Sequence, residues 1–219
     1  MSTLSGGQGN IITNGLVLRL DAANPRSYQS GSLIWNDLSG NGNNGTLVGG
    51  ITYADTNGGS LVFDGTSGYV TIPSSSLLNT LAQFTYTAYV NISSSDTYGA
   101  IIARDASLVW YAGRTAVSQR LYIGGSTTGD SSTFLPSDKY ASICVTWDGS
   151  TIRYYFNGVP DGVATNALSA FNTTPVTIGR YQTGEYFQGK INIIRIYNRA
   201  LSAQEVLQNF NATRARFGL

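Results

Sequence analysis

Residues 84–92 read Phe-Thr-Tyr-Thr-Ala-Tyr-Val-Asn-Ile, and their side chains alternate in character along the chain. Successive side chains of a β-strand point to opposite faces of its sheet, so this alternation divides them into two series. The apolar or aromatic series consists of Phe84, Tyr86, Ala88, Val90 and Ile92. The mainly polar series consists of Thr85, Thr87, Tyr89 and Asn91. The stretch predicts a strand of an antiparallel sheet that packs one face on a core.

The same period of two recurs from one end of the chain to the other. The further strands that it predicts are 16–21, 61–63, 69–72, 121–123, 143–147, 152–156, 176–178 and 191–197. Gly, Asn, Asp and Ser residues separate them, and pairs such as Asp64-Gly65 and Asn157-Gly158 suit tight turns that need a positive φ. Short strands with frequent turns are typical of a sandwich or jelly roll. We therefore expect an all-β fold of two antiparallel sheets.

One short helix is expected near the C-terminus. Ser202 stands where an N-cap is needed, and Glu205, three residues later, completes a capping box. Leu201 and Val206 are spaced to pack together as a hydrophobic staple. The apolar residues that recur at helical spacing are Val206, Leu207 and Phe210. This helix should pack its apolar side on the sandwich, which gives Glu205 a structural role.

Composition excludes several classes of protein. Of the 219 residues, 42% are hydrophobic, which is enough for a core, whereas 11% are charged and the formal net charge is +1. Because no basic stripe is present, nucleic acid is not expected as a partner. The chain has no histidine, which excludes Ser-His-Asp and Cys-His catalysis and histidine-bound metals. The single cysteine, Cys144, cannot form an intrachain disulfide and is interpreted as a packed small residue.

The beginning of the chain is rich in Gly, Ser, Thr, Gln and Asn. Residues 1–14 are therefore predicted to be a flexible arm, and residues 15–219 a single domain. The arm is either a disordered end or an attachment to a larger assembly, in which Ile11 and Ile12 would be the anchors. It lacks the basic and apolar regions of a signal peptide, and no apolar run approaches the roughly 20 residues that cross a bilayer. We expect a protein made in the cytoplasm without a membrane partner.

Several blocks, in order along the chain, resemble a known family. They are Gly15-Leu-Val-Leu-Arg-Leu-Asp-Ala22, Trp35–Leu47, Ser60-Leu-Val-Phe-Asp-Gly65, Tyr69–Pro73, Val145-Thr-Trp-Asp-Gly149, Tyr155-Phe-Asn-Gly158 and Ile196–Ser202. Together they are similar to laminin-G-like domains of the concanavalin A-like lectin/glucanase superfamily, of the stand-alone type found among bacteriophage structural proteins. The resemblance implies a jelly roll with one concave sheet, and ligands held at the concave face or at the rim loops.

The chain departs from this family at positions that matter for binding and catalysis. Thr66–Gly68 follow Phe-Asp-Gly where many relatives carry acidic residues. Asn192 and Ile193 stand where many relatives carry an Asp-Glu pair. The Glu-x-Asp-x-Glu strand motif of the family's glucanases is absent, and a retaining glycosidase needs two carboxyl groups about 5 Å apart. We therefore predict that the protein is not an enzyme.

Tyrosine side chains are the predicted ligand contacts, because sugar rings stack their C–H faces on aromatic rings. Tyr89, Tyr111 and Tyr155 fall on or beside polar faces of predicted strands, and cross-strand packing is the alternative role for them. No cofactor or metal site is predicted. If calcium binds, Asp64 and Asp37 are the first candidates, since Asp oxygens on loops are among its usual ligands.

The function predicted from these features is that of a non-catalytic virion structural protein of a bacteriophage. It would decorate the capsid or associate with the tail, and would be located in the virion. Its expected partners are other virion proteins and copies of itself in a symmetric assembly, with host glycans as a further contact. The first alternative is a carbohydrate-binding, lectin-like module, and the second is a degenerate glycoside hydrolase.

Overall fold

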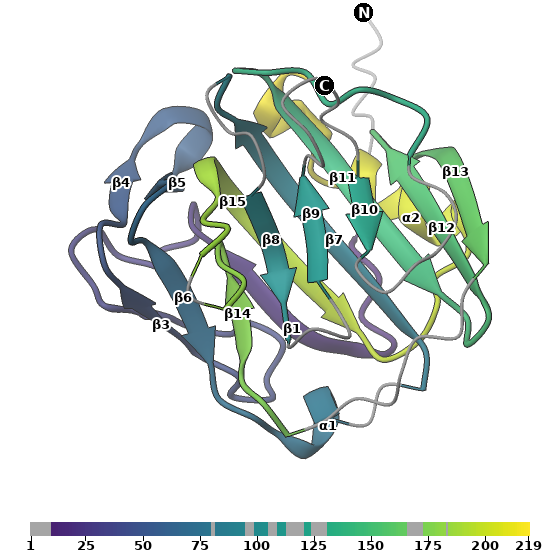
Figure 1. Cartoon of the computed structure of the whole chain (residues 1–219), viewed down its shortest axis with the longest axis horizontal. Coiled ribbons are helices and arrows are strands. Elements are labelled where there is room, and N and C mark those ends of the chain that lie inside the picture. The colour runs from purple at the N-terminus through teal and green to yellow at the C-terminus, as the bar shows by residue number, and fades with distance from the viewer. Residues whose placement is uncertain are drawn as a thin grey trace, which may run out of the picture.

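Two antiparallel sheets stacked face to face make up the protein (Figure 1). This computed structural model describes residues 10–79, 82–94, 99–104, 109–112, 121–123, 131–165, 173–182 and 184–219. All strand pairs formed within the described residues are antiparallel, apart from one isolated bridge between Ile92 and Ser137. The predicted all-β sandwich of two antiparallel sheets is confirmed.

Sheet A is the larger of the two, with eight strands among the described residues. Its order is β13-β12-β11-β7-β15-β5-β4, and β1 pairs in addition with β15. The bounds are β1 Leu16–Asp21, β4 Thr52–Ala54, β5 Ser60–Asp64, β7 Phe84–Ile92, β11 Tyr140–Trp147, β12 Thr151–Phe156, β13 Val159–Thr165 and β15 Gln188–Tyr197. The stretch 84–92 is thus the strand β7 near the middle of this sheet.

Sheet B has seven strands among the described residues, in the order β10-β9-β8-β14-β6-β3-β2. The bounds are β2 Ile34–Trp35, β3 Gly45–Val48, β6 Tyr69–Ile72, β8 Gly99–Ala103, β9 Val109–Ala112, β10 Leu121–Ile123 and β14 Val176–Ile178. In the view of Figure 1 this sheet lies in front of sheet A. Consecutive strands are neighbours at its two ends, whereas β14 in the middle pairs with β8 and β6, which come much earlier in the chain.

The core lies between the sheets and is built around aromatic rings. Phe84 stacks on Tyr86 with ring centroids 4.5 Å apart, and Phe84 also contacts Trp147 of β11 at 5.6 Å. Tyr86 reaches Trp110 of sheet B at 6.4 Å, so aromatic contacts join the two sheets. Phe84, Tyr86 and Trp147 come from the apolar series of predicted strands, whereas Trp110 lies in β9, which the period of two did not predict.

The helices are short. They are α1 Ser76–Asn79 and α2 Ala203–Asn211, with 3₁₀ helices at Thr56–Gly58 and Arg214–Phe217. No helix among the described residues has the length and apolar character needed to span a membrane. Helix α2 is the predicted C-terminal helix, and its capping box between Ser202 and Glu205 is present with both hydrogen bonds.

The buried side of α2 differs from the prediction at one position. Val206 and Phe210 are buried as expected, but Leu207 is 42% exposed. Asn209 is buried in its place, because it hydrogen-bonds both the beginning of the domain and the sheet beneath the helix. Helical spacing selects a side but cannot tell which polar residue on it will find buried partners.

Cys144 is a buried, free thiol in β11. It packs with Tyr155, Tyr197, Leu201 and Val206 between sheet A and α2. Burial raises the pKa of the thiol well above its ordinary value. A buried thiol in apolar surroundings is unreactive, so the interpretation of Cys144 as a packed small residue is confirmed.

Residues 10–14 belong to the domain, which corrects the predicted boundary of the flexible arm at residue 14. The backbone N–H of Ile12 donates to Asn209 Oδ1 at 2.8 Å, and its carbonyl accepts from the Tyr197 hydroxyl at 3.0 Å. Arg199 Nε donates to the carbonyl of Asn14 at 3.0 Å. Ile11 and Ile12 were expected to anchor the protein to a partner, but Ile12 packs on this chain's own residues. Residues 1–9 lie outside the described residues.

Replacing Glu205 by alanine is expected to lower the free energy of unfolding by about 1–2 kcal/mol. The carboxylate accepts from the Ser202 backbone N–H at 2.9 Å and forms a bidentate pair with Arg199 at 2.6 and 2.8 Å. These contacts, led by Arg199, lower the pKa of Glu205 from 4.5 to about 2. Because the folded-state pKa is the lower one, this stabilisation is present above pH 4.5 and is lost as the pH falls towards 2.

Thermal unfolding of the wild type and the variant between pH 2 and pH 7 measures this effect. Glu205→Gln is the matched control, since it keeps a bond to Ser202 but has no charge to lose. The difference between wild type and Glu205→Ala should shrink at low pH. Equal stability of the two proteins at pH 7 would contradict the role of Glu205 in the cap.

Candidate functional site

The outer face of sheet B, which points away from the core, carries a row of threonines. Thr46 of β3 pairs with Thr71 of β6, and Thr71 pairs with Thr177 of β14. Their neighbours along each strand belong to the core, so strand alternation places the three hydroxyl groups on the outer face. The Thr177 hydroxyl also donates to the carbonyl of Arg180 at 2.6 Å, which ties the following loop to this face.

The loop between β14 and β15 is closed at its base and strained at its tip. Gly179 donates to the carbonyl of Ile101, and Phe187 donates back to the carbonyl of Gly179 at 2.9 Å. Within the loop, Gln182 has φ +51° and Glu185 has φ +53°, which is the left-handed region that residues with a side chain seldom adopt. Such conformations persist only where the surroundings impose them, and they concentrate at functional sites.

Glu185 is the centre of this loop's contacts with sheet B. The Tyr111 hydroxyl of β9 donates to Glu185 Oε2 at 2.8 Å, and the Tyr111 ring meets the Tyr181 ring edge-on at 6.4 Å. Tyr111 is 5% exposed, whereas Tyr181 and Glu185 are only partly buried. Among the described residues, the second oxygen of Glu185 has no hydrogen-bond partner, so it can accept a bond from a ligand.

Arg180 supplies a cation on the same face. Its guanidinium lies over the Tyr69 ring of β6, 3.5 Å from the ring centroid. The Nε atom of Arg180 is buried and has no partner among the described residues. Stacking on an aromatic ring fixes the plane of a guanidinium while leaving its N–H groups free to donate.

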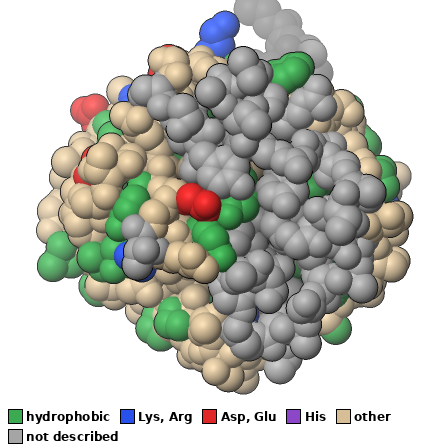
Figure 2. Space-filling model, viewed as in Figure 1, with side chains coloured by type: hydrophobic (Ala, Val, Ile, Leu, Met, Phe, Trp, Pro, Cys, Tyr) green, Lys and Arg blue, Asp and Glu red, His purple; other side chains and the backbone are tan. Residues whose placement is uncertain are grey.

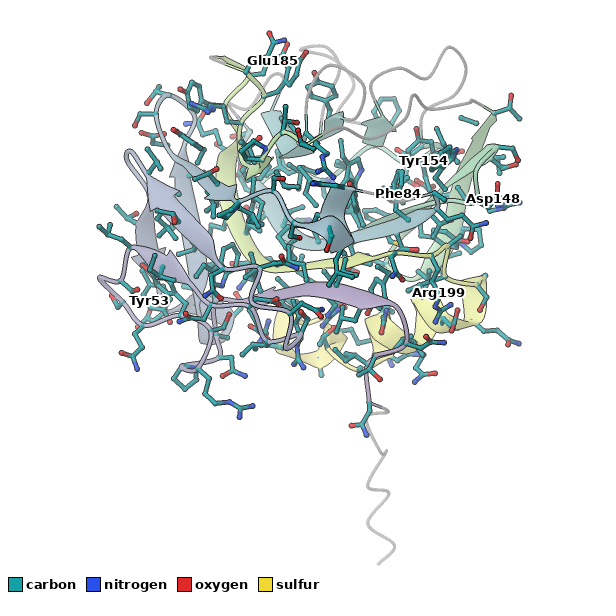
Figure 3. The ribbon with its side chains drawn as sticks, turned by 90° about the horizontal axis from the view of Figure 1, so that it is seen from below. Tyr53, Phe84, Asp148, Tyr154, Glu185 and Arg199 are labelled. Atoms are coloured by element: carbon teal, nitrogen blue, oxygen red, sulfur yellow. The ribbon has the colours of Figure 1, made fainter. Side chains whose placement is uncertain are left out.

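These residues form one surface, which we call the Glu185 face: Tyr69, Thr71, Tyr111, Thr177, Arg180, Tyr181 and Glu185. Figure 2 shows an acidic side chain among apolar ones on this side of the molecule. Figure 3 shows Glu185 on the opposite side of the sandwich from Arg199 and α2. The surface combines a carboxylate acceptor, a planar donor and aromatic rings, which suits a neutral ligand with many hydroxyl groups.

The three tyrosines predicted as ligand contacts are not brought together. Tyr111 lies in the Glu185 face, but Tyr89 and Tyr155 lie on the outer face of sheet A. Tyr89 is 1% exposed, stacks on Phe217 at 4.4 Å and donates its hydroxyl hydrogen to the carbonyl of Phe210. The expectation that Tyr89 contacts a ligand disagrees with this burial, because the C-terminal segment covers the polar face on which the prediction rested.

Tyr155 borders a groove between the β12–β13 hairpin and the start of α2. The groove has a volume of about 640 Å³, and Arg153, Asp161 and Leu201 also line it. Tyr155 itself is 3% exposed, and burial is the main reason that the pKa of its hydroxyl is raised. Its ring therefore packs between the sheet and the helix and offers little surface to a ligand.

Asp64 and Asp37 both organise turns. Asp64 accepts hydrogen bonds from the N–H groups of residues 66, 67 and 68 and from the Ser67 hydroxyl. With burial opposing them, these bonds hold the pKa of Asp64 well below its usual range. Asp37 accepts in the same way from Arg19, Ser39 and Asn43. Within the described part of the chain, no three acidic or cysteine side chains gather closely enough to hold a metal ion.

Sequence reasoning missed Arg180, Tyr181 and Glu185. One signal was present: Glu185 is one of two glutamates in the chain, the other is occupied in the helix cap, and aromatic residues surround it in Tyr181-Gln-Thr-Gly-Glu-Tyr-Phe187. The contact with Tyr111 could not be read from the sequence, because 74 positions separate the two residues.

Comparison with solved structures identifies neighbours with the same fold. Domain 4 of AbnA, a GH43 extracellular arabinanase from Geobacillus stearothermophilus solved with arabinotriose, has a TM-score of 0.71 and 23% identity over 89% of this chain and 97% of that one. A mutant of Trypanosoma rangeli sialidase has a TM-score of 0.70 and 16% sequence identity, and the match covers 95% of this chain but 34% of the sialidase. The binding domain of Paraclostridial Mosquitocidal Protein 1 has a TM-score of 0.66 and 16% sequence identity, and the match covers 91% of this chain and 52% of that one.

None of the curated protein sequences matches this chain significantly. A family model does match, over residues 64–207, which is more than half of the chain. The matched segment runs from Asp64 at the end of β5 to Leu207 in α2, and it includes the loop that carries Glu185. This protein therefore belongs to the concanavalin A-like lectin/glucanase superfamily.

Proposed function

We propose that this protein is a non-catalytic, lectin-like module that binds a glycan on the Glu185 face. The observation that carries the proposal is the arrangement of Glu185: Tyr111 binds one oxygen of its carboxylate, and no described residue binds the other. Two fold neighbours support the class of function: one was solved with arabinotriose, and another is the binding domain of Paraclostridial Mosquitocidal Protein 1.

A sugar presents hydroxyl groups around its edge and C–H groups on its faces. Glu185 would accept from two adjacent hydroxyls, and Arg180 would donate to a hydroxyl or ring oxygen. The partly buried Tyr181 ring lies beside Glu185 and offers an apolar surface for the sugar's C–H face. Because the surroundings of Glu185 hold its backbone in a left-handed conformation, little conformational entropy would be lost when a glycan binds.

The proposal excludes glycoside hydrolysis for a chemical reason. Glycosidases of the common kind hold two carboxyl groups about 5–9.5 Å apart, across the bond that they cleave. Glu205, the other glutamate, is bound to Arg199 on the opposite side of the sandwich from Glu185 (Figure 3). Four of the described aspartates, Asp37, Asp64, Asp148 and Asp161, accept several hydrogen bonds each within turns or between strands, and a fifth, Asp21, is paired with Arg216.

Glu185→Gln is expected to weaken glycan binding about tenfold or more, since a hydrogen bond to a charged group contributes about 1.5–3 kcal/mol. Tyr181→Ala should weaken it by a similar factor. Binding is measured by calorimetry on hits from an array of immobilised oligosaccharides that includes arabinotriose. The same oligosaccharides, incubated with the protein, should release no reducing ends.

Two variants on other surfaces serve as controls. Glu205→Gln changes the only other glutamate, and Tyr53→Ala removes a tyrosine that packs on Tyr28 with ring centroids 5.5 Å apart. Both should lose stability and keep the affinity for the glycan. If Glu185→Gln and Tyr181→Ala bind as tightly as the wild type, the glycan lies elsewhere and the assignment of the Glu185 face is wrong.

The finer part of the proposal is that the module sits on a bacteriophage particle, as a capsid-decorating or tail-associated protein in several copies. It is supported by the sequence features given above and by the place where the chain enters the domain. Gln208 of α2 donates to the carbonyl of Asn10 at 2.8 Å, so Asn10, where the described part of the chain begins, lies beside α2 on the side of the sandwich opposite Glu185. Attachment at this end of the domain would leave the Glu185 face turned outward.

Mass spectrometry of purified particles tests this location. The chain should be present in fixed stoichiometry with the major capsid or tail protein, and deleting residues 2–9 should remove it from the particles. Absence of the full-length chain from washed particles would overturn the virion part of the proposal and leave the glycan-binding part standing.

A further inference from the structure

Two arginines lie side by side on the outer face of sheet A, far from the Glu185 face. Arg195 of β15 is the direct cross-strand partner of Arg19 in β1, and Thr87 of β7 is its partner on the other side. Directly opposite residues in antiparallel strands have Cβ atoms about 4.5–5.5 Å apart, and like charges at such positions repel. The sheet therefore holds two cations together beside a hydroxyl group.

The C-terminal segment covers Arg195. Its side chain is 1% exposed. Tyr197, on the same face of β15, accepts a hydrogen bond from Asn209 of α2 at 3.1 Å. Ile193, on the other side of Arg195 along the strand, packs against Phe210 of α2. The guanidinium is thus enclosed between the sheet and the helix.

Several buried polar atoms of this cluster have no partner in the described part of the chain. Nε and Nη2 of Arg195, Nε of Arg19 and Oγ1 of Thr87 are all buried without a hydrogen-bond partner among the described residues. Neither guanidinium forms an ion pair with a described residue. The acid on the same face of β1, Asp21, is already bound by Arg216 at 3.0 and 3.2 Å.

An enclosed charge without a partner is strongly unfavourable, because the protein interior replaces water without returning its hydrogen bonds. A buried lysine or histidine would lose its proton under these conditions. Burial does lower the pKa of Arg195; Tyr197, Tyr89 and Asp21 oppose this shift, and the charge of Arg19 adds to it. Arginine nevertheless stays protonated in proteins, so the charge has to be met by an anion.

We propose that Arg195, Arg19 and Thr87 bind a small monovalent anion of the size of chloride beneath α2. The buried N–H groups of both arginines and the Thr87 hydroxyl are the donors that such an anion accepts from. A small ion is specified because Arg195 is fully covered, so a polyatomic anion would have to displace the helix. The ion would join β1, β7 and β15 under the C-terminal segment.

The first test measures thermal unfolding of the full chain while sodium methanesulfonate is replaced by sodium chloride at constant ionic strength. An anion that binds only the folded state stabilises it in proportion to the logarithm of its concentration above Kd. The melting temperature of the wild type should rise with chloride. The rise in melting temperature should be absent in Arg195→Met and reduced in Arg19→Gln. The second variant tests the proposal even if Arg195→Met is too unstable to fold, because Arg19 is less buried than Arg195.

Arg153→Gln is the matched control. Arg153 is an arginine on the same face of sheet A, but it is only partly buried and is paired with Asp148 at 2.6 Å. This variant should keep the full response to chloride.

The second test is the anomalous signal of bromide in crystals grown from bromide. It should place one ion within hydrogen-bond distance of Arg195 and Thr87. Equal melting temperatures in the two salts would overturn the proposal. In that case a bromide peak in the crystals would reflect an adventitious ion only, and the absence of a peak would agree with the melting data.

Discussion

Replacing Gly179 by alanine is expected to destabilise the protein by about 3 kcal/mol. Gly179 has φ +82°, where a side chain is strained, and a Cβ atom there would lie 2.5 Å from two carbons of the Phe63 ring. Phe63 is 1% exposed in the core and packs edge-on against Phe187, so its ring has little room to move. Chemical denaturation of the wild type and the variant measures the loss.

The same substitution should weaken glycan binding, because Gly179 begins the loop that presents Glu185 and its backbone closes that loop with Phe187. Gly184→Ala is the control within the loop: a Cβ atom there meets nothing within 4 Å, so both stability and binding should stay near the wild-type values. The double variant Gly179→Ala with Phe63→Leu should recover part of the stability. A fully stable Gly179→Ala protein would show that the loop has another way to close.

Deleting residues 2–14 is expected to lower the free energy of unfolding by about 2–4 kcal/mol. The deletion removes the bonds of Ile12 to Asn209 and Tyr197, the bond of Asn14 to Arg199, and the packing of Ile12. It also leaves Asn209 buried with an unpaired carbonyl oxygen. The melting temperature should fall by roughly 5–10 °C, as expected for such a loss in a chain of this size.

Deleting residues 2–9 alone is the matched control, and it should leave the melting temperature unchanged. The contrast places the boundary of the domain near residue 10 and not at residue 15. Hydrogen exchange at the Ile12 amide provides a second readout, since Asn209→Ala should expose that amide without shortening the chain. If the longer deletion melts at the wild-type temperature, the contacts of residues 10–14 contribute nothing to stability.

The parts of the fold that depend on neighbouring residues could be predicted. The strand 84–92, the turns at Asp-Gly and Asn-Gly, and the cap of Ser202 and Glu205 are each specified within a few positions of the chain. The inward series of each strand follows from alternation alone, as the core positions of Phe84 and Tyr86 illustrate.

The candidate site depends on pairs that are distant in sequence, and it could not be assembled in advance. Tyr111 and Tyr155 both stand beside polar strand faces, yet one meets Glu185 and the other is covered by α2. Alternation tells which side chains share a face, but it does not tell whether water, a helix or a loop lies over that face.

The sequence by itself determined the fold class, the family and the helix cap, because periodicity, turn chemistry and ordered motifs are properties of contiguous residues. The tertiary structure alone decided which faces stay open. It closed the outer face of sheet A with α2 and residues 10–14, enclosing Tyr89 and Arg195. It brought the 179–187 loop over sheet B and gave Glu185 its partner, because burial and hydrogen bonding between distant segments follow from how the sheets, helix and loops pack together.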